Sequence, residues 1–334
     1  TQNPPPAFVE PIFPFSTVST KSWDLFFRSS LGHGTLVQWG LDWEGKTPYT
    51  KNDTKLMAPA SVMKLITATA ALKVLGPDFV FENQFSADLN PNNGDLTHPE
   101  FVVSGDPTWG DLSHYEPYMQ RFEKIVAELK ARNVQRVVGP IKVTSSRPRL
   151  LTLQRPTGWK ASWMHETYAS MLTPFIFNGN AGSFTIGYNS AKKAKYIKWI
   201  TPGITTPVKK IKASYCTSKD CDSVYGEVTL DGLGRTVSYD SLLGYYYKNP
   251  KDPGRYSELP VYESEKWLTN LFEIALKAAG IQHVETSDTL SLYTDKVVVE
   301  LNSKPLREIL GPFLRNSINI VGDRLFYEIA DRFP

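Results

Sequence analysis

The sequence predicts an α+β fold, and three observations predict it. Residues 56–76 are apolar on nearly every side of a helix, which is typical of a helix buried inside a sizeable domain. Residues 80–290 form short strand-like runs, turns and two amphipathic helices. From residue 297 the apolar helical pattern returns. The 334 residues are enough for one large domain or for two to three smaller ones.

The composition is that of a soluble globular protein, with 41% hydrophobic and 21% charged residues. The net charge of +3 is small, so we expect no nucleic-acid partner. The longest apolar run, 56–76, is interrupted by Lys64 and Lys73, which excludes an integral membrane segment there. Oligomeric state cannot be read from these numbers.

Histidines and cysteines give little sign of metal chemistry. The five histidines are scattered and no CxxC or HExxH pattern occurs, so we expect no metal and no cofactor. Cys216 and Cys221 lie in a polar, turn-like segment where a small disulfide loop fits geometrically. Two unrelated thiols are the alternative, and the redox compartment decides between them.

The first part of the chain predicts an arm, a hairpin and a helix. The sequence starts with neither Met nor a basic segment, so we expect a processed or trimmed form without a signal peptide. Residues 1–22 are Pro-rich and polar, and residues 22–30 could form a short helix. Residues 35–43 and 47–49 flank a turn at 44–46 and predict a hairpin. The helix that follows begins near Pro59 and ends at Gly76.

Two segments of residues 80–290 share one pattern of Asp-Pro turn, helix and strand. The first has a helix near 118–131 and a strand at 137–138; the second has a helix near 263–279 and a strand near 283–284. The repetition indicates either a weak internal duplication or two ordinary units. Residues 192–199 predict a strand whose lysines face water.

Two helices are predicted near the end of the chain, at 305–314 and 321–330. The second carries Leu325, Phe326 and Ile329 at core spacing.

Ser61 and Lys64 break the apolar pattern at the start of the 56–76 helix. At i and i+3 they share one face and can touch. Burial and the helix N-terminus both disfavour the ammonium form of Lys64, and a neutral amine beside a hydroxyl is a general base. The alternative is a structural Lys, which would have to be buried with no acid nearby in sequence. A second Ser-x-x-Lys, at 190–193, lies in a polar strand and is interpreted as chance.

Ser317 and Asn319 form the only Ser-x-Asn of the chain and lie between the last two predicted helices. The functional interpretation is a hydroxyl that relays a proton to the leaving group and an amide that holds Lys64 and the substrate. The structural alternative is a helix connection with a capping side chain.

Together these residues resemble a known family. Ser-x-x-Lys with Ser-x-Asn belongs to the signature of penicillin-binding proteins and class A β-lactamases, whose third motif is Lys-Thr-Gly. The chain is most similar to the class C low-molecular-mass penicillin-binding proteins, of the penicillin-binding-protein-4 type. The resemblance covers most of the chain and lies in these segments: Pro59 to Leu72, Leu75 to Pro77, Ser104 to Thr108, Gly158-Trp159, Tyr168, Pro174, Asn178 to Asn180, and Pro305 to Leu310 leading into Ser317.

The resemblance implies a transpeptidase-like core, an antiparallel sheet with a buried nucleophile helix, formed by the two chain ends and interrupted by a large mixed α/β insertion. We therefore expect core residues at 1–79 and 294–334 and inserted domains at 80–293. It implies a secreted, periplasmic or extracellular D-alanyl-D-alanine carboxypeptidase or endopeptidase. Its partners would be peptidoglycan stem peptides and β-lactams, and its catalytic residues Ser61, Lys64, Ser317 and Asn319, of which Ser61, Ser317 and Asn319 would also bind substrate.

The sequence departs from the family in one motif. No Lys-Thr-Gly, His-Thr-Gly or Lys-Ser-Gly occurs, and only 334 − 319 = 15 residues follow Asn319. We expect the motif beyond Pro334, because a core without that strand would expose its helix. The alternative is a catalytically impaired peptidoglycan-binding or scaffold relative. β-Lactamase activity is less favoured, because no residue is identified as a dedicated deacylating base.

Overall fold

The structure is a computed structural model that describes residues 39–43, 46–51, 58–111, 114–147, 167–189, 194–205, 208–213, 226–230, 236–239, 257–261, 263–285, 293 and 295–333. The chain divides into two compact units, residues 1–60 and 61–334. In the first unit, β1 (Trp39–Trp43) pairs antiparallel with β2 (Lys46–Lys51), which confirms the predicted hairpin. The arm at 1–22 and the helix at 22–30 lie outside the described residues.

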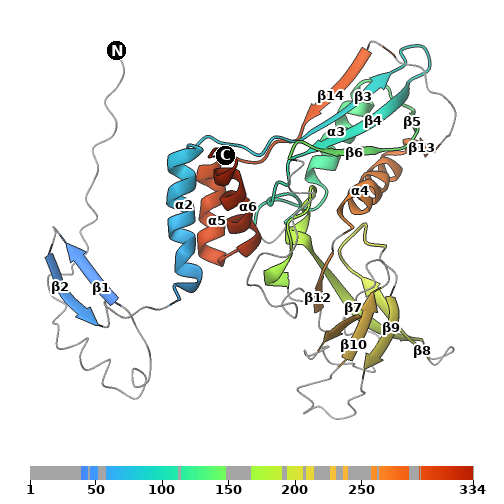
Figure 1. Ribbon diagram of the computed structural model, residues 1–334. Coiled ribbons are helices and arrows are strands. Elements are labelled where there is room, and N and C mark those ends of the chain that lie inside the picture. The colour runs from blue at the N-terminus through green and yellow to red at the C-terminus, as the bar shows by residue number, and fades with distance from the viewer. Residues whose placement is uncertain are drawn as a thin grey trace, which may run out of the picture. The chain divides into compact units, whose positions relative to one another are not determined.

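Three helices of the second unit lie side by side, although they come from distant parts of the sequence (Figure 1). They are α2 (Met63–Val74), preceded by the 3-10 turn η2 (Ala60–Val62), α5 (Leu306–Asn316) and α6 (Asn319–Ala330). The buried Ala68 and Ala71 of α2 share one apolar cluster with residues of α5 and α6. These small side chains allow close packing. All three helices were predicted to within a few residues.

The sequence predicted a helix enclosed on every side, and the described residues show something different. Val62, Leu65 and Ile66 are 64%, 56% and 62% exposed. The reason is that α5 and α6 cover one side of α2, while the other described elements of the second unit leave its opposite side open. The sequence also placed Phe326 in the core, which is wrong, because its side chain is 62% exposed. The buried face of α6 instead runs through Val321, Arg324, Leu325 and Glu328.

A mixed six-stranded sheet forms a second core. Five of its strands are neighbours in the order β13-β5-β4-β3-β14. The sixth strand, β6, pairs with β4 and is not part of this order. The bounds are β3 (Gln84–Leu89), β4 (Asp95–Val103), β5 (Arg136–Val138), β6 (Lys142–Ser145), β13 (Gln282–Val284) and β14 (Asp295–Glu300). The amphipathic helices α3 (Gln120–Ala131) and α4 (Ser264–Ala279) bury their apolar faces in this core. Both helices confirm the sequence prediction.

The two segments that share the turn–helix–strand pattern end beside each other. Their strands β5 and β13 are parallel neighbours, with His283 opposite Val137. Both strand positions were predicted. Whether the repetition reflects a duplication stays open, since parallel pairing of two ordinary units gives the same arrangement.

Two smaller antiparallel sheets complete the described chain. One has the order β12-β7-β8 and the other β11-β10-β9. Their bounds are β7 (Ala181–Asn189), β8 (Ala194–Trp199), β9 (Val208–Ala213), β10 (Gly226–Leu230), β11 (Thr236–Tyr239) and β12 (Ser257–Pro260). Two short 3-10 turns precede β7, namely η5 (Thr167–Ala169) and η6 (Asn178–Asn180). Strand β8 confirms the strand predicted near 192–199. Cys216, Cys221 and the second Ser-x-x-Lys at 190–193 lie outside the described residues.

The last part of the chain takes part in both cores. Strand β14 pairs antiparallel with β3, and α5 and α6 follow it and pack with α2. The domain boundaries expected at residues 79/80 and 293/294 stay predictions. Among the described residues, no helix is long and apolar enough to cross a bilayer.

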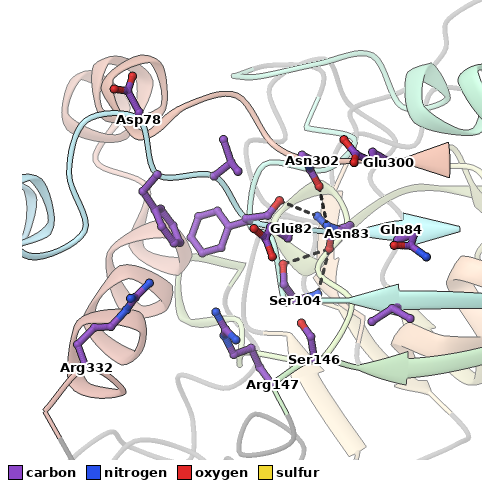
Figure 2. Close-up of a pocket in the computed structure, with 14 residues that line it drawn as sticks. Asp78, Glu82, Asn83, Gln84, Ser104, Ser146, Arg147, Glu300, Asn302 and Arg332 are labelled. Atoms are coloured by element: carbon purple, nitrogen blue, oxygen red, sulfur yellow. Dashed lines mark hydrogen bonds between the residues drawn. The ribbon is translucent and has the colours of Figure 1, made fainter. Parts of the chain in front are cut away.

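Asn83 holds three strand ends together at the edge of a cavity of about 630 Å³ (Figure 2). Its backbone N–H donates to Asn302 Oδ1 at 3.1 Å. Its side-chain Oδ1 accepts from the Ser104 backbone N–H at 2.9 Å, and its Nδ2 donates to Asp106 at 3.2 Å. Through its backbone and its side chain, the buried Asn83 therefore links the start of β3 to the residues that follow β4 and β14.

A buried charge network connects α6 to the sheet. Arg324 and Glu328, each 1% exposed, pair at 2.7 Å on successive turns of α6. Arg324 Nη2 also donates to the Ser104 carbonyl at 2.9 Å, and Arg147 after β6 pairs with Glu328 at 2.8 Å. Burial would raise the pKa of Glu328, but the two arginines outweigh it and hold that pKa below its usual value. This network fixes the rotation of α6 about its axis.

Candidate active site

Ser61 and Lys64 lie one turn apart where η2 passes into α2, as the i, i+3 spacing predicted. The Lys64 Nζ donates to Ser61 Oγ across 3.1 Å. Ser61 is exposed, and Lys64 is half-buried rather than fully buried as the sequence suggested. The neighbouring Ala60 has a φ of +45°, a left-handed conformation that costs a non-glycine residue free energy. The serine hydroxyl is therefore open to a ligand and has an amine beside it.

Ser317 and Asn319 reach the same place from the junction of α5 and α6. Ser317 ends α5 with φ 56° and ψ 44°, a left-handed cap, and Asn319 is the first residue of α6. The Ser317 hydroxyl donates to Ser61 Oγ at 2.8 Å over a separation of 256 residues. The Asn319 Oδ1 accepts from Lys64 Nζ at 2.5 Å. The structure thus brings together all four predicted site residues, and their catalytic roles remain to be tested.

A fourth contact comes from η5, in the middle of the chain. The Asn319 Nδ2 donates to the Tyr168 carbonyl of η5 at 2.8 Å. This bond orients the amide, because its oxygen faces the amine and its nitrogen faces a carbonyl. The sequence marked Tyr168 only as part of the family resemblance. Its role was missed because a backbone carbonyl leaves no signal in residue type.

The segment after Tyr168 is anchored by a fully buried asparagine. Asn180 Nδ2 donates to the Met171 carbonyl and to Thr173 Oγ1, both at 2.9 Å. Its Oδ1 accepts from the Phe177 backbone N–H at 3.3 Å. The Asn-x-Asn segment that supported the resemblance therefore shapes the loop that presents the Tyr168 carbonyl to Asn319.

The electrostatics of the site depend on an acid that sequence reasoning missed. Burial lowers the pKa of Lys64, and the nearby Asp323 opposes this by raising it. Burial raises the pKa of Asp323 to about 6, against the opposite influence of Lys64. Asp323 lies four residues after Asn319 on α6, so its i+4 spacing from a suspected site residue was an available signal.

These contacts form a hydrogen-bonded chain from Asn319 through Lys64 and Ser61 to Ser317. A Lys64 amine without its extra proton can accept the proton of the Ser61 hydroxyl, which makes that oxygen nucleophilic. The Ser317 hydroxyl contacts the same oxygen and can carry a proton to a departing group. The described residues hold no group of three or more His, Cys, Asp or Glu that could bind a metal ion. None of the four site residues lines the cavity of Figure 2.

Comparisons with known proteins agree with the resemblance inferred from the motifs. Residues 41–333 match the D-Ala-D-Ala carboxypeptidase 3 (S13) family. A D-alanyl-D-alanine carboxypeptidase from Actinomadura sp. (strain R39) is 33% identical over 294 residues, which are 82% of this chain and 50% of that protein. The chain therefore spans half the length of this curated relative.

Solved structures show a similar fold. The crystal structure of penicillin binding protein 4 from Haemophilus influenzae matches with a TM-score of 0.54 and 18% identity, over 86% of this chain and 60% of that chain. A second structure of the same protein, complexed with a novel β-lactam, matches with a TM-score of 0.47 and 18% identity, over 86% of this chain and 59% of that one. At this identity the first match establishes the fold alone.

Proposed function

Because this chain belongs to the D-Ala-D-Ala carboxypeptidase 3 (S13) family, we propose that it is a D-alanyl-D-alanine carboxypeptidase or D,D-endopeptidase. Its substrates would be peptidoglycan stem peptides, which lie outside the cytoplasm, and β-lactams would acylate it. The proposal assigns to the whole protein the activity for which its relative is named, and this chain covers half of that relative's length.

The observation that carries the proposal is the contact set of the Ser61 oxygen. Lys64 Nζ lies 3.1 Å from it, and Ser317 Oγ lies 2.8 Å from it. A structural Ser and Lys at a helix start would not explain a second hydroxyl that arrives from residue 317. A nucleophile between a base and a proton carrier does explain it.

In the proposed reaction, Ser61 Oγ attacks the carbonyl carbon of the penultimate D-alanine while its proton moves to Lys64. The Ser61 backbone N–H would contribute to stabilising the oxyanion. The tetrahedral intermediate then collapses, the C–N bond breaks, and the leaving amine takes a proton that Lys64 passes on through Ser317. Water hydrolyses the resulting ester and regenerates the Ser61 hydroxyl. Asn319 holds the Lys64 amine throughout, through its Oδ1 contact at 2.5 Å.

A β-lactam offers the same acyl donor in a strained ring, so it would form the same ester on Ser61. The test is labelling of the full-length protein with a fluorescent penicillin. The unmodified protein should label and Ser61→Ala should not. Ser190→Ala is the matched control, because Ser190 starts the other Ser-x-x-Lys of the chain, and that variant should label normally. Labelling that survives Ser61→Ala would exclude this nucleophile.

A second candidate function is peptidoglycan binding without turnover. It predicts that the full-length protein binds stem peptides but neither releases D-alanine nor reacts with penicillin. Rapid hydrolysis of nitrocefin would instead indicate a β-lactamase.

A further inference from the structure

The face of α6 that meets Lys64 carries a second polar residue. Asn319 accepts a hydrogen bond from Lys64 Nζ, and Asp323 lies one helical turn farther along. Residues at i and i+4 share one face of a helix, so the Asp323 carboxyl is on the side of α6 that carries the amide bound to Lys64. Helix α2, which carries Lys64, belongs to the same apolar cluster as α6.

Asp323 differs from the neighbouring charges of α6 in having no fixed partner. Arg324 and Glu328 are fully paired with each other and with the sheet. Asp323 is half-buried, and no hydrogen bond or ion pair joins its carboxyl to another residue of the described ranges. A half-buried carboxyl with no structural partner is costly to keep ionised.

Lys64 is the charge that acts on Asp323. The elements packed against α6 carry the following charged or titratable groups: Lys64 and Lys73 on α2, Arg307, Glu308 and Arg315 on α5, and Tyr168 on η5. Of these, Lys64 influences the pKa of Asp323, and Asp323 in turn influences that of Lys64. The two groups are therefore coupled through space.

We propose that Asp323 is a positioning residue that sets the protonation of Lys64 from one turn below Asn319. The idea rests on the proposed function, in which Lys64 must be unprotonated to activate Ser61. An ionised Asp323 stabilises the ammonium form of Lys64 and keeps a proton in the site for delivery to the leaving group. A neutral Asp323 no longer stabilises the ammonium form, so Lys64 loses its extra proton more readily and can accept the proton of Ser61.

The test is the pH profile of penicillin acylation. In Asp323→Asn the negative charge is gone, so the pKa of Lys64 falls and the free amine persists to lower pH. The acid limb of the acylation rate should move to lower pH by about one unit, the low end for a nearby opposite charge. Asp323→Glu keeps the charge and should leave the limb close to its original position. Glu308→Gln removes an exposed carboxylate from α5 and is the matched control that should shift nothing.

A merely structural role for Asp323 gives a different result. It predicts an equal loss of rate at every pH with an unmoved limb, and that outcome would overturn the proposal. If Asp323→Asn does not fold, Asp323→Ser gives the same comparison. If the protein does not react with penicillin at all, the Lys64 Cε resonance of ¹³C-lysine-labelled protein, assigned with Lys64→Arg, reports its pKa directly. An unchanged Lys64 titration in Asp323→Asn or Asp323→Ser overturns the inference, whereas labelling that survives Ser61→Ala overturns only the proposed function.

Discussion

At the scale of single residues, each of the four site side chains is hydrogen-bonded to at least one of the other three. Ser61 contacts both Lys64 and Ser317, and Lys64 contacts both Ser61 and Asn319. Removing one member therefore leaves its neighbours with an unmet hydrogen bond. For this reason, matched substitutions at one position are more informative than single alanine variants.

Ser317 allows such a matched pair. Both Ser317→Ala and Ser317→Gly remove the hydroxyl, and each should slow penicillin acylation by about a hundredfold or more. They should differ in stability, because φ is 56° at this position and suits glycine. We expect Ser317→Gly to be more stable than Ser317→Ala by about 1 kcal/mol in urea unfolding. Labelling of both variants at the unmodified rate would exclude the hydroxyl from the proton path.

Asp323 predicts a pH dependence of stability. Its pKa is about 6 in the folded protein, above the value of about 3.9 in an unfolded chain. Between these values the folded state holds the proton more tightly, so the free energy of unfolding falls as pH rises from about 4 to about 6. Between these two pH values, the unfolding free energy of Asp323→Asn should fall by about 2 kcal/mol less than that of the unmodified protein. Urea unfolding of both proteins at the two pH values measures it, and a pH-independent difference between them would contradict the prediction.

At the scale of elements, the segment around η5 holds the helix that carries Asn319. The Tyr168 carbonyl accepts from Asn319, and Asn180 and Phe177 fix the segment behind it. Phe177 in turn lies against Gly110, where an added Cβ would come within 2.1 Å of the Phe177 ring. The geometry of the site therefore depends on Gly110, which precedes the first residue of η5 by 167 − 110 = 57 residues.

Gly110→Ala tests this dependence. The residue has a φ of +63° as well as the close ring, so both backbone strain and overpacking oppose a side chain. We expect a loss of about 2–4 kcal/mol in unfolding free energy, together with slower acylation because Tyr168 shifts. Gly280→Ala is the matched control. Its φ is +77° but nothing lies within 4 Å of an added Cβ, so it should cost about 1 kcal/mol and leave acylation unchanged.

At the scale of the second unit, buried charges join its two cores. Glu328 on α6 binds both Arg324 and Arg147, and Arg324 also binds the Ser104 carbonyl after β4. Buried pairs contribute little beyond an apolar replacement, but losing one partner leaves an uncompensated charge. The network therefore specifies how α6 sits on the sheet.

Glu328→Gln should cost about 3–5 kcal/mol, because it leaves two arginines without their counter-charge. Glu128→Gln is the control. It breaks another i, i+4 pair, with Arg132 on α3, whose side chains are 40% and 37% exposed, so the loss should be at most about 0.5 kcal/mol. Chemical denaturation of the two variants measures both, and equal effects would mean that burial of the Arg324–Glu328 pair is not what matters.

The sequence by itself determined the local features of this protein. Periodicity, Pro59 and Gly76 located α2, and the same reasoning located α3, α4, α5 and α6 to within a few residues. The spacing of Ser61 and Lys64 was enough to predict their contact, because residues at i and i+3 meet on any helix. The pairing of these two with Ser317 and Asn319 came from the family resemblance.

Tertiary structure alone decided the rest. Patterns along the chain report which face of an element is apolar, but not which element covers it, so α2 is open on one side and Phe326 is exposed. Contacts across hundreds of residues depend on how helices and strands pack, and this produces the Lys64–Asn319 bond and the β3–β14 pairing. The contact of the Tyr168 carbonyl with Asn319 and the position of Asp323 near Lys64 both depend on the packing of α6 with α2 and η5. Residue type alone does not predict either one.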